Sequence, residues 1–461
     1  MLDSSSIRLL RQLGTVSATA LVISNMIGTG IFTATGFLAG PLGSPSLVLS
    51  IWIVGAVCAL AGALCYSELG INFPSSGGEY VYLTEAFGPT WGFMTGWVSF
   101  FAGFSAPIAA AALACADYAG YFFPALKQNG PAYVIGTGAW QIRFGWAQGL
   151  ACVVVAIFTA LNCFGLRRTA RIQNLLTGGK VFVIVAFIVA ALVAGNGNWH
   201  HFAEPAARTG STPLAAQYAI SLFFIYVSYS GWNAATYVAE ELKQPSKTLP
   251  IALATGTALV AALYVALNVV FIYSTPLEQT KGVVAIGALA ASRLFGPGVA
   301  GAFSAAMAIS LLATVNAMVT IGPRVYYAMA RNSAFFPAAA RVHPRWHTPV
   351  IALVSQGVCT VLITLTPFRD LLTYIGFTLN FFAVLSVASL FVFRRRPGWQ
   401  KLRVLDVGFP AIPVFFVVIG VWMTIIGLTL EPRVSLSAVV TIATGALAYH
   451  FRRRRQAAAS A

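Results

Sequence analysis

The stretch Ala20–Gly40, ALVISNMIGTGIFTATGFLAG, is apolar enough to cross a membrane, but its centre disfavours a helix. Gly28, Thr29 and Gly30 lie about halfway along an apolar run that starts near residue 15. Because a helix rises 1.5 Å per residue and the hydrocarbon core is ~30 Å thick, these three residues fall near the bilayer midplane. The stretch therefore predicts a membrane span that is interrupted at its centre.

Composition extends this membrane assignment to the whole chain of 461 residues. Hydrophobic residues make up 58% of it and charged residues only 9%, and the mean hydropathy is +0.80. Apolar runs of about 20 residues, long enough to cross a bilayer, follow one another nearly from end to end. This pattern predicts a single all-α integral membrane domain and excludes a soluble catalytic domain. The basic residues that give the net charge of +16 lie between the apolar runs and not on one soluble face, which argues against nucleic acid as a partner.

About twelve transmembrane helices are expected from the apolar runs and from the turn and charge signals that separate them. Their expected ranges are roughly 15–40, 46–69, 90–123, 146–166, 172–195, 214–239, 249–274, 297–330, 348–366, 369–393, 407–430 and 434–451. An even number of helices places both termini on the same side of the membrane.

The basic residues indicate that this shared side is the cytoplasm. Arg8, Arg11 and the Arg452–Arg455 tail lie there, as do most basic residues of the loops, in agreement with the positive-inside rule. The opposite side retains Lys127, Arg143, Arg208, Lys281, Arg293, Arg369 and Arg433. We therefore expect an inner or plasma membrane protein with cytoplasmic termini. The long first apolar run, which lacks a convincing cleavage site, predicts that no signal peptide is removed.

A second interruption is expected in the span 214–239, where Ser228–Gly231 lies at a similar depth but is reached from the opposite side. Interrupted spans at corresponding positions of two halves of a chain point to the binding site of a transporter, because unwound backbone is tolerated in lipid only where it lines a cavity. The alternatives are close helix packing at the small residues Gly28 and Gly30, and ordinary packing of the aromatic residues Tyr226, Tyr229 and Trp232.

Lys180, in RIQNLLTGGKVFVIVAFIVA, is the basic residue that falls inside the membrane. A lysine at the bilayer centre costs on the order of 2.5 to 3.5 kcal/mol, and such residues usually face an interior site. The alternative is snorkelling of the side chain to the headgroups. Facing the interior, the ammonium could serve as a fixed cation or release a proton.

No acidic residue is expected at the depth of Lys180, which argues against a polycation as the principal substrate. The acidic residues near span ends are expected to be solvated at the interface: Glu68, Glu79, Glu85, Asp117, Glu240, Glu241, Asp370 and Asp406. The six cysteines lie in apolar runs and are expected to be free. No metal ligand set, cofactor motif or catalytic residue is predicted.

Three motifs resemble the amino acid, polyamine and organocation (APC) transporter superfamily: GTGIF at 28–32, RIQNLLTGGK at 171–180, and SYSGWNAATYVAEELKQPSKTLP at 228–250. YSGWN followed by EE is most similar to the L-type amino acid transporter branch and to bacterial amino acid permeases. The resemblance implies a LeuT-like fold with helices 1 and 6 broken at the midplane. It also implies inverted five-helix repeats at 15–195 and 214–393, followed by two further helices at 407–451.

The resemblance also implies a substrate site at the two interruptions. Backbone amides of the first interruption would bind the substrate carboxylate, and carbonyls of both interruptions would bind its ammonium. The implied substrate-binding residues are Ile23, Ser24, Met26, Thr29, Gly30, Ile31, Tyr226, Val227, Ser228 and Ser230. Lys180 matches the lysine that takes the place of sodium in sodium-independent relatives. Val227 departs from the L-type pattern, which often has a bulky aromatic residue there, so the size of the pocket stays open.

The implied function is sodium-independent secondary active transport of neutral amino acids by alternating access, as an exchanger or a proton symporter. The alternatives are an amine, polyamine or cationic amino acid permease and, from other classes, a channel or a membrane-embedded enzyme. The outer loop from Lys127 to Arg143 contains no cysteine, so no disulfide-linked glycoprotein partner is expected. The expected partners are a small amino acid substrate and the lipid bilayer.

Overall fold

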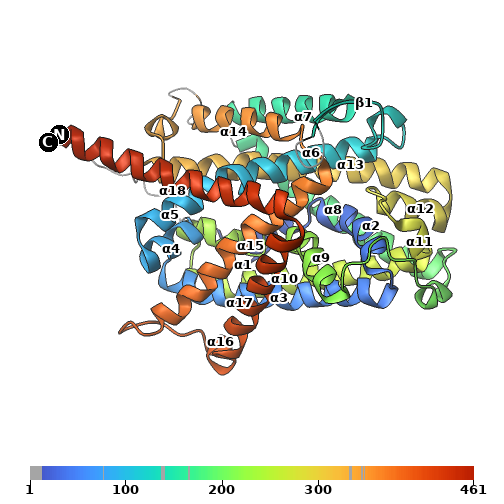
Figure 1. The fold of residues 1–461 in the computed structure, drawn as a ribbon, viewed down its shortest axis with the longest axis horizontal. Coiled ribbons are helices and arrows are strands. Elements are labelled where there is room, and N and C mark those ends of the chain that lie inside the picture. Colours follow the sequence, from blue (N-terminus) through green and yellow to red (C-terminus); the bar gives the residue numbers. More distant parts are fainter. Residues whose placement is uncertain are drawn as a thin grey trace.

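The computed structural model describes residues 13–75, 77–136, 141–164, 167–331, 335–343, 346 and 348–460, which form a helical bundle with one short hairpin (Figure 1). In this part of the chain, ten helices or interrupted helix pairs are long and apolar enough to cross a membrane. The apolar helices Gly178–Ala194 and Val350–Ile363 are shorter than such a span. The prediction of an integral membrane protein with many apolar helices is confirmed.

The elements follow the predicted order of apolar runs. The long helices are α3 (Pro45–Asn72), α7 (Trp146–Cys163), α8 (Arg167–Ala194), α10 (Pro245–Ser274), α13 (Pro297–Arg331), α14 (Val350–Ile363), α15 (Phe368–Phe393), α17 (Ala411–Leu430) and α18 (Pro432–Ser460). Two helical pairs and one triplet also belong to this series: α1 (Thr15–Met26) with α2 (Gly30–Leu42), α5 (Pro89–Val98) with η1 (Ser99–Ser105) and α6 (Ala106–Ala119), and α9 (Leu214–Tyr229) with η5 (Ala234–Glu241). The short helix α4 (Glu79–Phe87) lies between α3 and α5.

Smaller elements cap the ends of the bundle. They are η2 (Pro124–Leu126), β1 (Ala132–Ile135), β2 (Ile142–Gly145), η4 (Trp199–Ala203), α11 (Leu277–Thr280), α12 (Ile286–Phe295), η6 (Pro337–Ala340) and α16 (Arg403–Val407). Strands β1 and β2 form an antiparallel hairpin in which Ala132 is opposite Gly145, a departure from the expected all-α chain. In Figure 1, α4 and α5 lie at the left end of the bundle and α11 and α12 at the right end.

The first helical pair is interrupted at residues 27–29. Helix α1 ends at Met26, Ile27 has a non-helical ψ of 85°, and α2 begins at Gly30. In the second pair, α9 ends at Tyr229 and the 3₁₀ helix η5 begins at Ala234. Between them, Gly231 has a φ of +99°, a backbone conformation that favours glycine.

Glycines bring the two interruptions into direct contact. A Cβ added at Gly30 would lie 2.6 Å from Cβ of Ser228, with Cα and Oγ of Ser228 nearer still. A Cβ added at Gly231 would lie 2.7 Å from the carbonyl carbon of Asn25. Because neither contact leaves room for a side chain, each glycine lets one interrupted span approach the backbone of the other.

The third expected span, 90–123, is also irregular. Between α5 and α6 the chain forms the π-helical turn η1, which holds an extra residue per turn. Such turns occur often at functional sites because they rotate the following side chains away from the regular helical face. No feature of the sequence predicted this irregularity.

Three acidic residues near span ends, Glu68, Glu79 and Asp117, are buried, and the prediction that they are solvated is wrong for them. Glu68 is fully buried and accepts two hydrogen bonds from the Arg394 guanidinium, at 2.7 and 2.6 Å. Asp117 is also buried and accepts a hydrogen bond from the backbone N–H of Gln128, at 2.7 Å. The carboxylates of Glu68 and Asp117 close loops back onto helices, a tertiary arrangement that local sequence does not encode.

Candidate functional site

A cavity of about 100 Å³, lined by both polar and apolar side chains, lies beside the two interruptions. Since a water molecule needs ~10 to 15 Å³ of such volume, the cavity has room for several water-sized groups. Its walls come from α1, α4, α5, η1, α6, α9, α13, α15 and the segment 230–238. The polar side chains that line it are those of Asn25, Glu79, Thr95, Ser99, Tyr226, Ser230, Asn233 and Tyr237. Apolar side chains form the rest of the wall, among them those of Leu21, Val98, Phe104, Trp232, Met318, Ile321, Leu379 and Phe382.

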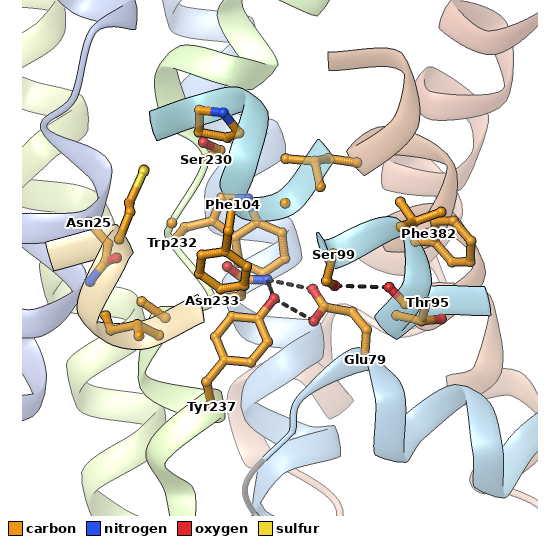
Figure 2. Close-up of a pocket in the computed structure, with 18 of the residues that line it drawn as sticks. Asn25, Glu79, Thr95, Ser99, Phe104, Ser230, Trp232, Asn233, Tyr237 and Phe382 are labelled. Atoms are coloured by element: carbon orange, nitrogen blue, oxygen red, sulfur yellow. Dashed lines mark hydrogen bonds between the residues drawn. The ribbon is translucent and has the colours of Figure 1, made fainter. Parts of the chain in front are cut away.

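One end of the cavity is formed by a buried carboxylate, that of Glu79 at the start of α4. Figure 2 shows Asn233 and Tyr237 pointing at its two oxygens. The Asn233 amide donates to Oε1 at 2.5 Å and the Tyr237 hydroxyl to Oε2 at 2.6 Å. The Tyr66 hydroxyl donates to Oε1 at 3.2 Å. Burial raises the pKa of Glu79, and the hydrogen bonds from Tyr237, Tyr66 and Asn233 oppose that shift.

The sequence interpretation missed Glu79. It assigned this residue to the solvated interface and expected no carboxylate at the site, and both expectations are wrong because Glu79 is 9% exposed and lines the cavity. Gly77 and Gly78, with φ values of +135° and +52°, turn the chain back so that α4 starts beneath the cavity. The adjacent glycines in SSGGE were the one sequence signal of this reversal.

Of the residues implied to bind substrate, Tyr226 and Ser230 line the cavity. The others lie along the contact between the interruptions or just behind it: Ile23, Ser24, Met26, Thr29, Gly30, Ile31, Val227 and Ser228. Met26 illustrates the tight packing there, since its carbonyl accepts hydrogen bonds from the Tyr264 hydroxyl at 2.6 Å and the Gly28 N–H at 2.8 Å.

Lys180 contacts the first interruption and is not among the residues that line the cavity. Its Nζ donates to the carbonyl of Ile27 at 2.5 Å and to Oγ1 of Thr314 on α13 at 2.9 Å. The residue is 3% exposed, so its ammonium does not reach the headgroups. An ammonium in this position neutralises the partial negative charge of a helix-end carbonyl and ties α8, the interruption and α13 together.

The arrangement of the interruptions by itself indicates a class of membrane protein. Two interrupted apolar spans packed against each other beside a cavity are typical of secondary transporters. The sequence profile of the amino acid permease family, described as "Amino acid permease", matches residues 13–445, and the chain belongs to this family. The resemblance to the APC superfamily is thereby confirmed.

Individual relatives within the family have names that describe transporters. The chain is 28% identical over 447 residues to the human "Large neutral amino acids transporter small subunit 2", covering 96% of this chain and 80% of that one. It is 29% identical over 415 residues to the "Serine/threonine exchanger SteT" of Bacillus subtilis, covering 88% of each. It is 28% identical over 452 residues to the mouse "Asc-type amino acid transporter 1", covering 96% and 81%.

Proposed function

We propose that this protein carries neutral amino acids across the membrane by alternating access. The observation that carries the proposal is the contact of the two interruptions, Gly30 on Ser228 and Gly231 on Asn25, beside a cavity that polar side chains help to line. The names of the relatives support the substrate class, since they describe transporters of large neutral amino acids and an exchanger of serine and threonine.

The ends of the interrupted helices offer partners to both charged groups of a zwitterionic substrate. The first N–H groups of α2, at Thr29, Gly30 and Ile31, have no acceptor within their own helix and lie at its positive dipole end, where a carboxylate is stabilised. Carbonyls at the ends of α1 and α9 and the Ser230 hydroxyl offer acceptors to the substrate ammonium. A substrate that entered from the cavity would separate Gly30 from Ser228 and take the place of that contact.

Lys180 is proposed to replace a sodium ion. Its ammonium donates to the Ile27 carbonyl and to the Thr314 hydroxyl, which are oxygens of the kind that coordinate a cation in sodium-coupled carriers. A fixed cation supports exchange or facilitated transport without a sodium gradient. If the ammonium lost its proton during the cycle, the same residue would support proton symport.

Access to the cavity is proposed to be from the cytoplasm. With the N-terminus inside, Leu21 and Asn25 lie on the cytoplasmic half of the first span, and Ser230 to Val238 lie on the cytoplasmic half of the span that begins with α9. The outer half is packed, because a Cβ at Gly36 would overlap the backbone of Val283 and the ring of Phe37 stacks on Phe224 at 5.7 Å. We infer an inward-facing or occluded state.

The test is uptake into liposomes that contain the purified protein. Radiolabelled leucine, serine, threonine, arginine and putrescine are offered with and without unlabelled amino acid inside, in sodium or potassium buffer. The proposal expects saturable uptake of a neutral amino acid that is accelerated by internal amino acid and is unchanged when potassium replaces sodium. A requirement for sodium contradicts the role of Lys180, and uptake that does not saturate contradicts the carrier.

A second candidate function follows from Glu79. A carboxylate on the cavity wall offers a partner to a substrate with a second positive charge, which favours a cationic amino acid or amine permease. Neutral substrates remain the first choice because both Glu79 oxygens already accept hydrogen bonds from protein side chains. Uptake of arginine or putrescine in preference to every neutral amino acid in the panel would reverse this order.

A further inference from the structure

Gln356 is a polar side chain buried at the middle of the apolar helix α14. It is 1% exposed, and neither its amide nitrogen nor its amide oxygen has a hydrogen-bond partner among the residues that the structure describes. Thr360 lies one turn further along the same face of α14, is fully buried, and has a hydroxyl that likewise lacks such a partner. No other side chain in the described part of the chain combines two buried polar atoms without a partner.

An unpaired amide is unfavourable in this position. Burying a polar group without a hydrogen bond costs free energy, and the apolar surroundings of a membrane bundle provide no bulk water to supply one. A leucine or methionine of similar volume would avoid this cost in an apolar helix. Because proteins break such local rules mainly at functional sites, we expect the Gln356 amide to find a partner during transport.

Gln356 adjoins a residue of the cavity wall, although it does not line the cavity itself. The π-helical turn η1 packs against α13 and α14, and its residue Phe104 lines the cavity (Figure 2). A Cβ added at Gly322 on α13 would lie 2.9 Å from Cγ of Phe104 and 3.0 Å from Cδ of Gln356, with the amide oxygen nearer still. The Phe104 ring and the Gln356 amide therefore pack against the same glycine.

We propose that Gln356 is a specificity-determining residue: when the Phe104 ring turns away from Gly322, the amide forms a subsite for the hydroxyl of a serine or threonine side chain. An amide and a hydroxyl each donate and accept hydrogen bonds, so the two groups pair well. An apolar substrate side chain would leave the buried amide unpaired, which is how such a site discriminates. The proposal rests on the proposed function, because it concerns which neutral amino acids the same cavity takes.

The test compares threonine with valine, which has nearly the same shape but a methyl group in place of the hydroxyl. Initial rates of counterflow in liposomes are measured for both amino acids at low concentration, and their ratio is compared between variants. Gln356→Leu is expected to lower the threonine-to-valine ratio by about two- to tenfold, because a hydrogen bond between neutral groups contributes that much net affinity. Thr257→Val, which removes a buried hydroxyl without a described partner on α10, is expected to keep the wild-type ratio.

Phe104→Ala provides a readout that a merely structural role of Gln356 would not move. Removal of the ring opens the amide to the cavity, so the threonine-to-valine ratio is expected to rise above that of the wild type. The double variant Phe104→Ala with Gln356→Leu is expected to lose this rise. If Gln356→Leu fails to insert into membranes, Gln356→Met, which is closer to glutamine in shape, takes its place in both comparisons.

Three results overturn the inference: a ratio that Gln356→Leu leaves unchanged, a fall of the same size in Thr257→Val, or a rise in Phe104→Ala that is absent or that persists in the double variant. An unchanged ratio together with a lower apparent melting temperature of Gln356→Leu would assign the amide to bound water alone. Each of these results leaves amino acid exchange intact. Absence of saturable exchange of any neutral amino acid by the wild-type protein would instead refute the proposed function.

Discussion

Gly28 and Gly30 lie two residues apart in the first interruption, yet alanine substitution at the two positions is expected to have opposite outcomes. A Cβ at Gly30 would lie 2.6 Å from Cβ of Ser228. Carbon atoms prefer a separation of ~3.5 to 4.0 Å, so α2 and α9 must part by about 0.9 Å or more to admit the methyl group. A Cβ at Gly28 would lie 3.7 Å from Cγ2 of Thr314, which is ordinary contact.

The expected losses of stability and of turnover therefore differ between Gly30→Ala and Gly28→Ala. Overpacking of this kind typically destabilises by ~1 to 3 kcal/mol, and a displacement near 1 Å at a binding site can reduce turnover by on the order of 10²-fold. Gly28→Ala is expected to stay within about 0.5 kcal/mol of the wild type, because the added methyl group would make only ordinary contacts and the φ of Gly28 lies outside the left-handed region.

Initial rates of amino acid counterflow measure the functional effect, and the apparent melting temperature in detergent measures the structural one. Gly30→Ala is expected to lose nearly all counterflow while it still folds, whereas Gly28→Ala keeps most of the wild-type rate. The reasoning fails if Gly30→Ala transports normally, or if Gly28→Ala is impaired to the same degree.

Two further perturbations test other parts of the molecule. Lys180→Ala, which removes the donor to Ile27 and Thr314, is expected to abolish counterflow while the protein remains monodisperse in detergent; full transport would contradict a role for the ammonium. Arg394→Met leaves the fully buried Glu68 without its ion-pair partner and is expected to destabilise by ~3 to 5 kcal/mol. The double variant with Glu68→Leu should recover much of that loss in apparent melting temperature, and equal melting of the single and double variants would show that the pair is not coupled.

The sequence predicted features that depend on position along one helix. The rise per residue converts distance along the chain into depth, so it predicted the depth of the first interruption and the position of Lys180 within an apolar run. The length of apolar runs likewise predicted most of the candidate spans, because about 20 residues are required to cross the hydrocarbon core. These quantities need no knowledge of neighbouring helices.

The burial of acidic residues could not be predicted from their position along one helix. Glu79 and Glu68 both lie near predicted span ends, where solvation is the ordinary outcome. Glu79 is instead covered by Tyr66, Asn233 and Tyr237, and Glu68 by the Arg394 guanidinium. These donors come from elements distant in the chain, so their presence depends on how the helices pack.

The sequence by itself determined that this chain crosses the membrane many times and that one span is weakened at Gly28, Thr29 and Gly30. It treated the two glycines as equivalent, because both lack a side chain and both fall near the same depth. Only the tertiary structure distinguished them, since Gly30 packs against Ser228 whereas Gly28 meets Thr314 at ordinary distance. The physical reason is that helix weakness is a local property of the backbone, whereas the need for a missing side chain depends on which residue of another span lies opposite it.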